Sequence, residues 1–416
     1  MKRTPVIVVA GQEMTDDVCE TLARTPGTIV VRHRFDGHVV VRSVRIGDDL
    51  RPHTSEWPLE LTNCCVDCTI REDLLILLRR LHRRDDARRI VVHLAPWLEP
   101  EPVCWAINNV IVRVGPGYTD GPAARDVRIE AVVSTVHTAA WLTQALDDEV
   151  LDDDRTVAQV VVGQAEFADV LVLSATHDRT SAVLRRLAPR SQHVVGPALL
   201  EPALAALQWT ARRGREHNPH EALLAGQPPL GADGDVELVE FNADRPFHPM
   251  RLHIAIDDLL DGVVRVRGRA WLATQPDAVV WIESAGGGMK VGHAGEWLAS
   301  SAEHSDGYAD PVGIVLVELD TAVCHSFSCS NYSELRGPVH SPDLAAAESV
   351  LARFEIDLSG DTRPEVRCVE RCDRTRGGLA FADQLPEVLG TDSTRRHDPD
   401  ACDHYTPSAH RFASQS

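Results

Sequence analysis

Short apolar runs that alternate with helix-like stretches are the feature that most constrains the fold of the first half of this chain. The runs with strand character are residues 6–10, 28–32, 89–94, 128–134 and 168–173. Between them, residues 71–81 and 180–187 space their apolar side chains at the helical period. Strands that alternate with helices favour an α/β domain around a mostly parallel sheet. We therefore predict one such domain over residues 1–205.

A second, smaller unit follows a stretch rich in glycine, proline and charge. This composition predicts a linker, which we place at residues 206–235. Residues 236–300 then contain an alternating strand pattern at 236–241, a helix at 252–260, and strands at 263–272 and 278–284. We predict a small α+β domain there. Residues 301–416 show little periodicity, and we assign them to no domain and expect a poorly ordered tail. A shifted reading frame in a GC-rich gene would produce a similar pattern.

The charge balance narrows the class of partner. The 416 residues include 62 acidic and 42 basic side chains, which gives a formal net charge of −20. Such a charge argues against direct DNA binding and against an anionic membrane surface. No apolar run approaches the roughly 18 residues of a membrane span, and the apolar N-terminal stretch is too short for the core of a signal peptide. We expect a cytoplasmic protein whose partner is another protein, a metal or a small molecule.

The strongest local signal is a cluster of thiols ahead of the helix predicted at 71–81. Cys64, Cys65 and Cys68 lie within five residues of one another, together with the carboxylate of Asp67. Thiolates and carboxylates are ligands that Zn²⁺ accepts, and a tight turn can direct two or three of them to one point. A nearby helix N-terminus and Arg71 favour the thiolate form. These four residues are our candidate zinc ligands, with a remote histidine or water to complete the site; buried structural cysteines or a redox pair are the alternatives.

This segment resembles the CobW-type metal-linked GTPases, which have a Cys-x-Cys-Cys motif followed by Thr-Leu-Arg-Glu-Asp-Leu. Residues 68–74 read Cys-Thr-Ile-Arg-Glu-Asp-Leu. Aligned on them, Cys65, Asp67 and Cys68 fall on the three cysteine positions of the family, and Cys64 replaces a glycine. Residues 164–173 resemble the stretch before the guanine-reading motif of the family, and residues 236–300 resemble its C-terminal domain. The resemblance implies a P-loop-NTPase-like fold.

The residues that would bind GTP in this family are missing. A phosphate loop reads Gly-x4-Gly-Lys-Ser/Thr, so that backbone amides and a lysine hold the phosphates. Residues 11–18 read Gly-Gln-Glu-Met-Thr-Asp-Asp-Val, so that Asp16 and Asp17 replace the second glycine and the lysine. Val18 replaces the hydroxyl that would bind magnesium. Since carboxylates repel a triphosphate, we predict a degenerate phosphate loop.

The other two GTPase elements have changed in the same way. His93 and Pro96 replace the acidic residue and the glycine of the switch sequence Glu-Thr-Ser-Gly of the family. The guanine-reading Asn-Lys-x-Asp becomes Ser-Ala-Thr-His at residues 174–177. The only lysines of the chain, Lys2 and Lys290, lie far from these positions in the sequence. We therefore expect a pseudo-GTPase that does not bind or hydrolyse GTP in the usual way.

Three functions remain open. The first is a non-catalytic, zinc-linked adaptor. Here the chain most resembles the degenerate actinobacterial members of the group, which implies action under zinc shortage and recruitment of a ribosome-hibernation factor to the ribosome. The second is a zinc metallochaperone that delivers metal to a client protein. The third is a thiol-redox enzyme that uses Cys65 and Cys68. Separately, the arginines at 79, 80, 83 and 84 share one helix face and offer either a contact site or a solvated face.

Overall fold

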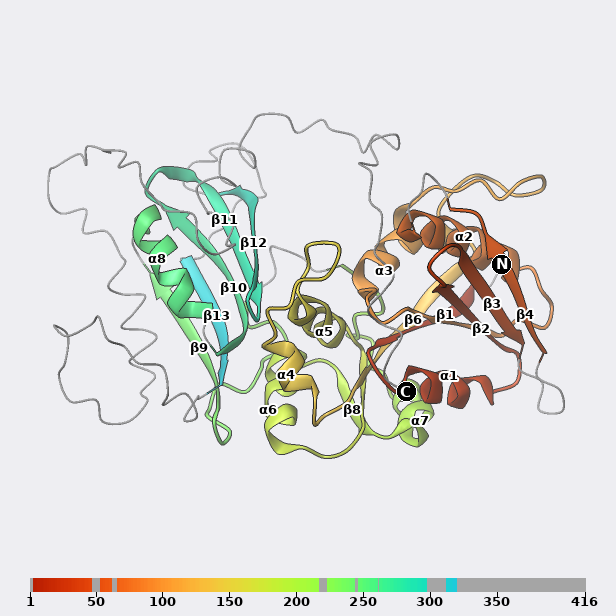
Figure 1. Cartoon of the computed structure of the whole chain (residues 1–416), viewed down its shortest axis with the longest axis horizontal. Coiled ribbons are helices and arrows are strands. Elements are labelled where there is room, and N and C mark those ends of the chain that lie inside the picture. Colours follow the sequence, from red (N-terminus) through yellow and green to blue (C-terminus); the bar gives the residue numbers. More distant parts are fainter. Residues whose placement is uncertain are drawn as a thin grey trace, which may run out of the picture. The chain divides into compact units, whose positions relative to one another are not determined.

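The computed structural model describes residues 3–46, 53–61, 66–216, 223–243, 246–260, 262–297 and 312–319. The chain divides into two compact units, which separate between about residues 218 and 230. The first contains an eight-stranded α/β sheet and the second a five-stranded antiparallel sheet (Figure 1). Among the described helices, none is both long and apolar enough to cross a membrane.

The sheet of the first unit is mostly parallel, as predicted. Its strand order is β4-β3-β2-β5-β1-β6-β7-β8, and the pairs from β2 to β8 are all parallel. The hairpin strands β3 and β4 extend it in antiparallel fashion. The strands are β1 (Thr4–Gly11), β2 (Thr28–Phe35), β3 (Val40–Ile46), β4 (His53–Leu59), β5 (Arg89–His93), β6 (Val127–Val136), β7 (Val170–Leu173) and β8 (Gln192–Val195).

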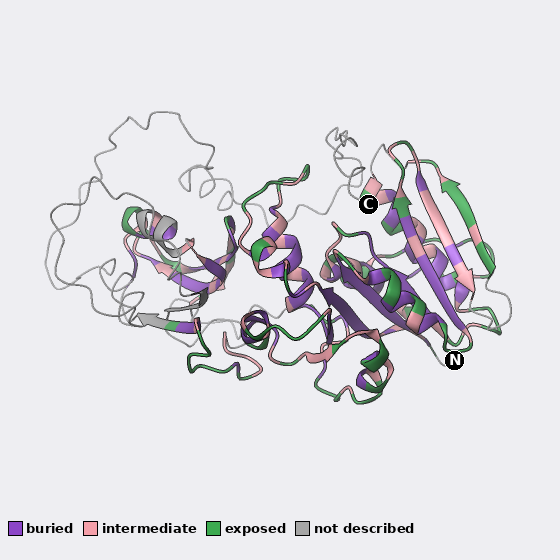
Figure 2. Cartoon of the chain, turned by 60° about the horizontal axis from the view of Figure 1, so that its bottom comes forward, coloured by how far each residue is buried: buried purple, intermediate pink, exposed green. Residues whose placement is uncertain are grey.

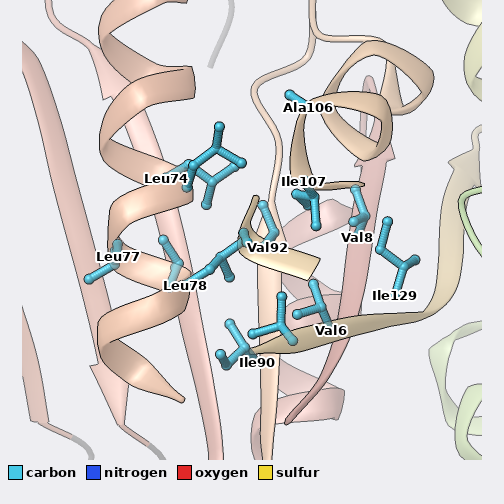
Figure 3. Close-up of a cluster of buried hydrophobic side chains, with 14 of the residues drawn as sticks. Val6, Val8, Leu74, Leu77, Leu78, Ile90, Val92, Ala106, Ile107 and Ile129 are labelled. Carbon is cyan, nitrogen blue, oxygen red and sulfur yellow. The ribbon is translucent and has the colours of Figure 1, made fainter. Parts of the chain in front are cut away.

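Helices cover both faces of this sheet. They are α1 (Thr15–Ala23), α2 (Val66–Leu81), α3 (Pro100–Asn109), α4 (Trp141–Ala145), α5 (Val157–Glu166), α6 (Asp178–Leu187) and α7 (Leu200–Ala205). On one face, Leu74 and Leu78 of α2 and Ile107 of α3 pack on Val8 and Val92 (Figure 3). Residues of α1 and α7 pack on the other face. The central strands are therefore buried on both sides, which explains their continuous apolar sequences (Figure 2).

Part of the stretch predicted as a linker is attached to the first unit. Asp169 accepts hydrogen bonds from the backbone N–H groups of Val132, at 2.9 Å, and of Arg213, at 2.9 and 3.1 Å. The Arg213 guanidinium in turn donates to the carbonyl oxygen of Glu130 at 2.9 Å. Residues 206–216 are therefore fastened by a buried carboxylate, in contrast to the free linker expected from their composition.

The second unit is a sheet with one helix packed on it. Its strand order is β12-β11-β10-β13-β9, and all pairs are antiparallel. The elements are β9 (Val236–Ala243), α8 (Pro249–Leu260), β10 (Val263–Leu272), β11 (Gln275–Ala285), β12 (Gly288–Glu296) and β13 (Val312–Leu319). Leu252 and Ile256 of α8 pack with Val266, Ala270 and Ile282 in its core. This is the small α+β fold that the sequence predicts.

Strand β13 changes the expected end of this unit. It lies between β10 and β9 and pairs with both, so that these two strands are joined only through it. The boundary predicted at residue 300 therefore falls inside the sheet instead of after it. Strand β13 is mostly apolar, but it was not assigned to this unit because the residues that separate it from β12 have no strand periodicity. The other residues of the expected tail, 301–311 and 320–416, lie outside the described residues.

Candidate functional site

The cysteine motif meets the start of α2. Helix α2 begins at Val66, so that Asp67 and Cys68 lie on its first turn. Cys64 and Cys65, the other two candidate zinc ligands, lie outside the described residues. Within the described part of the chain, no group of three or more histidine, cysteine or acidic side chains is arranged to hold a metal. Of the four candidate zinc ligands, only Asp67 and Cys68 can therefore be examined in the structure.

Cys68 differs from the other described cysteines in its surroundings. Its thiol is partly exposed, and Nη2 of Arg71 lies 3.8 Å from Sγ. The helix N-terminus and this guanidinium both place positive charge next to the sulfur, which favours a thiolate. By contrast, Cys19 and Cys104 are buried, and burial raises the pKa of both thiols well above its usual value. Of these three cysteines, only Cys68 is suited to bind a metal.

Asp67 faces a loop that follows β5. Loss of hydration raises the pKa of its carboxyl group, and this effect is opposed by the charge of Arg155 and by a hydrogen bond with the Trp97 side chain. The Arg155 guanidinium donates to the carbonyl oxygen of Trp97 at 3.0 Å and forms an ion pair with Glu99 at 3.3 Å. The carboxylate is thus held between a neutral donor and a cation. Its role as an oxygen ligand for zinc stays a prediction.

Residues 94–99 are here called the β5 loop, and the first three of them align with the end of the switch sequence. Two glutamines hold them in place. Gln12 Nε2 donates to the carbonyl oxygen of Pro96 at 2.6 Å and to Oε1 of Gln164 at 3.1 Å. Gln164 Nε2 donates to the carbonyl oxygens of Pro96 and Leu98, both at 2.9 Å. These contacts join the segment after β1 to the β5 loop.

The segment from the end of β1 to the first turn of α1 has two residues with positive φ and carries negative charge. Gly11 has φ of 136°, and a Cβ built there would lie 2.0 Å from Oγ1 of Thr135. Met14 precedes the helix with φ of 63°. Asp16 lies on the first turn of α1 and forms an ion pair with Arg32 at 2.9 Å. Negative side chains thus occupy the helix N-terminus, where a phosphate loop would bind an anion.

The remaining substituted positions of the GTPase pattern also have structural partners. His93 is buried, and loss of hydration together with the nearby charge of Arg32 lowers its pKa to about 4, although Asp16 acts in the opposite direction. His177, which stands where the guanine-reading aspartate would be, accepts a hydrogen bond from the Thr180 N–H and so caps α6. Ser174 accepts from the N–H of Thr138 at 3.0 Å.

The arginines at 79, 80, 83 and 84, here called the arginine stripe, do not share one helix face as expected, because α2 ends at Leu81 and Arg83 and Arg84 lie after it. Three of them contact a neighbouring loop. Arg79 is buried and donates to Asp126 at 2.7 Å and to the carbonyl oxygens of Thr119 and Gly121. Arg80 donates to the carbonyl oxygen of Val114, and Arg83, in the turn after the helix, donates to that of Gly117. Arg83 also lies over the ring of Tyr118. The stripe therefore stabilises residues 112–121, which neither sequence-based interpretation anticipated.

Four residues near the motif were not singled out by sequence reasoning: Gln12, Trp97, Arg155 and Gln164. No residue type among them is typical of a catalytic or metal site. Gln12 and Gln164 lie 152 positions apart in the sequence and meet only because β1 and α5 both end near the β5 loop. A weak signal existed in the stretch 164–173, whose similarity to the CobW-type GTPases begins at Gln164.

Comparison with known protein families supports both units. The family described as "CobW/HypB/UreG, nucleotide-binding domain" matches residues 37–198. The family described as "Cobalamin synthesis protein cobW C-terminal domain" matches residues 236–320. The second match includes β13 and so agrees with the extent of the five-stranded sheet.

Individual relatives were found in bacteria and in an amoeba. The chain is 60% identical over 308 residues to a protein of Mycobacterium tuberculosis (strain H37Rv) named Zinc chaperone Rv0106, which covers 74% of this chain and 77% of that protein. It is 24% identical over 278 residues to Zinc-regulated GTPase metalloprotein activator 1 of Dictyostelium discoideum, over 60% of this chain and 56% of that protein. The Zn(II)-bound YjiA GTPase from E. coli gives a TM-score of 0.37 at 12% identity, over 86% of this chain and 100% of that one. The resemblance stated from the cysteine motif is confirmed: this chain belongs to the CobW family.

Proposed function

We propose that this protein is a non-catalytic, zinc-linked adaptor that acts under zinc limitation and recruits a hibernation factor to the ribosome. The observation that most supports a non-catalytic role is the ion pair of Asp16 with Arg32 on the first turn of α1. At this position a GTPase needs backbone amides and a lysine to hold phosphate oxygens. Here Asp16 and Asp17 would repel a triphosphate, and Arg32 is already paired.

Zinc is the ligand that fits the remaining motif. Cys65 and Cys68 supply thiolates, and Asp67 and Cys64 are the additional candidate ligands. The names of two relatives, a zinc chaperone and a zinc-regulated GTPase metalloprotein activator, support a role connected with zinc. Bound zinc would cross-link the segment before α2 to its first turn. It would therefore order a surface that a protein partner can recognise.

The ribosome is a proposal that rests on the family resemblance of the sequence. With a formal net charge of −20, the chain as a whole would be repelled by ribosomal RNA. Contact would therefore be made through ribosomal proteins or the hibernation factor.

Co-sedimentation with ribosomes tests this proposal. The tagged protein and its Cys65→Ala, Cys68→Ala variant would be compared in extracts of zinc-starved and zinc-replete cells. We expect zinc-dependent association of the wild type that is lost in the variant, while a Cys104→Ala control behaves as wild type because that thiol is buried away from the motif. Absence of association under both zinc conditions would reject the ribosome as the partner.

A second candidate function is delivery of zinc to a client protein. The name of the mycobacterial relative favours it. In this case release of the metal would need an energy source other than ordinary GTP binding. Transfer of zinc from the loaded protein to an apo-client, lost in the same cysteine variant and independent of ribosomes, would distinguish this function from the adaptor.

A further inference from the structure

We propose that Gln12 and Gln164 hold the β5 loop in place of a bound nucleotide, and that they thereby position Asp67 in the cysteine motif. In nucleotide-dependent switches, contacts from the γ-phosphate and its magnesium order the corresponding loops, which are released on hydrolysis. In this chain two side-chain amides make the ordering contacts. The part of this proposal that concerns zinc rests on the function proposed above.

The NH₂ donors of the two amide groups are all hydrogen-bonded. Each glutamine NH₂ group has two hydrogens to donate. Those of Gln12 point to the Pro96 carbonyl and to Gln164 Oε1, and those of Gln164 point to the Pro96 and Leu98 carbonyls. Pro96 accepts two of these bonds. Because all the backbone partners in the β5 loop are acceptors, the orientation of both amides is fixed.

Burial strengthens this arrangement. Gln164 is 2% exposed, so water competes poorly for its hydrogen bonds. Gln164 lies on α5, whose N-terminus is fixed by a capping box between Thr156 and Gln159. Gln12 follows Gly11, the last residue of the central strand β1. The network therefore connects the β5 loop to two rigid elements of the first unit.

The β5 loop in turn reaches the cysteine motif. Trp97 lies between Pro96 and Leu98, both of which are held by the glutamines, and its side chain hydrogen-bonds the Asp67 carboxylate. Arg155 supports the same contact from the other side, through the carbonyl oxygen of Trp97 at 3.0 Å. A continuous series of polar contacts thus joins Gln12 to Asp67. If the glutamines release Pro96, we expect Trp97 and Asp67 to lose their fixed geometry.

The variant Gln12→Met tests the network, since methionine has a similar volume and no donor. Amide hydrogen exchange of residues 94–99 in the metal-free protein should rise about tenfold, in line with the loss of one or two hydrogen bonds. Zinc affinity, measured by competition with a chelator, should fall three- to tenfold. Gln12→Lys keeps a donor and should restore much of both. The matched control is Gln144→Met on α4, which should change neither.

A double-mutant cycle makes the test independent of zinc. Free energies of unfolding of Gln12→Met, Asp67→Asn and the double variant should be non-additive if the two residues are coupled through Trp97. Additive effects would overturn the positioning role, as would unchanged exchange of residues 94–99 in Gln12→Met. Faster exchange with unchanged zinc affinity would also overturn it. If the wild type binds no zinc, the proposed function is rejected. Amide hydrogen exchange and the double-mutant cycle still test whether the glutamines hold the β5 loop and position Asp67.

Discussion

Asp16 lies on the first turn of the helix that follows the central strand, and its carboxylate is 2.9 Å from the guanidinium of Arg32. We predict that 1 mM GTP with magnesium leaves the melting temperature of the wild type unchanged, because a ligand whose Kd exceeds its concentration stabilises by less than about 0.4 kcal/mol. The measurement is thermal unfolding with and without nucleotide. A rise of several degrees would contradict the prediction.

A restored loop provides the positive control for this experiment. The triple variant Asp16→Gly, Asp17→Lys, Val18→Thr returns the phosphate-binding pattern to residues 11–18. We expect it to gain measurable binding of a triphosphate. GTP and ATP should bind alike, because Ser174 and His177 make structural contacts and no aspartate is present there to pair with guanine.

His93 should make the stability of the first unit depend on pH. Its pKa in the folded chain is about 4, below the ordinary value of 6.5, so the folded state favours the neutral ring. The unfolded chain therefore binds more protons between these two values, and stability falls as the pH is lowered from 6.5 to 4. At about 1.4 kcal/mol for each pKa unit, the loss is about 3 kcal/mol.

The variant His93→Gln isolates this contribution. It cannot titrate, so its free energy of unfolding should vary less with pH than that of the wild type between pH 6.5 and 4. Urea unfolding at a series of pH values measures the difference. Parallel curves for the two proteins would show that His93 titrates equally in the folded and unfolded chains.

Arg79, in the last turn of α2, should be far more important for stability than Arg84, which lies after the end of this helix at Leu81. Replacement by methionine leaves the Asp126 carboxylate and the carbonyl oxygens of Thr119 and Gly121 without their buried donor. We expect a loss of about 3–5 kcal/mol. Arg84→Met removes an exposed pair with Asp86 and should cost less than about 0.5 kcal/mol. Denaturant unfolding of both variants gives the comparison, and equal losses would refute it.

Asp169 should protect residues 206–216 from proteolysis. The variant Asp169→Ala leaves the N–H groups of Val132 and Arg213 without an acceptor, which costs about 1–3 kcal/mol for each buried group. Trypsin should then cleave near Arg213 several-fold faster than in the wild type. Asp147→Ala, which changes an exposed carboxylate that accepts from the N–H of Glu149, is the control. Equal cleavage rates in all three proteins would show that other contacts hold the segment.

The sequence predicted the central strands but not the edge strands, for a physical reason. Strands buried on both faces are mostly apolar, and residues 6–10 and 90–92 show this directly. At the edge, β4 reads His-Thr-Ser-Glu-Trp-Pro-Leu and has mostly exposed residues, so it has no such pattern. The four residues of β8 are too few to show a period. Strand β13 is mostly apolar, but the aperiodic residues before it concealed that it belongs to the second sheet.

The candidate site was predictable only as far as residue chemistry identifies it. Clustered cysteines and an aspartate next to a helix start suggest metal binding, because these are ligand types that zinc accepts. The amide contacts of Gln12 have no such signature, since glutamine is common on every protein surface. They depend on the meeting of two segments 152 residues apart. The changes at Asp16 and Asp17 could be recognised in the sequence because the phosphate-loop pattern is strict. The ion pair of Asp16 with Arg32 could be seen only in the structure.

The glycine that ends β1 has a consequence for how divergent members of this family are recognised. At Gly11 any side chain would collide with Thr135 on the neighbouring strand, and φ of 136° is strained for every other residue. Strand packing alone thus requires glycine here, whether or not a phosphate ever approaches. The presence of glycine at this position is therefore no evidence that a divergent member binds a nucleotide.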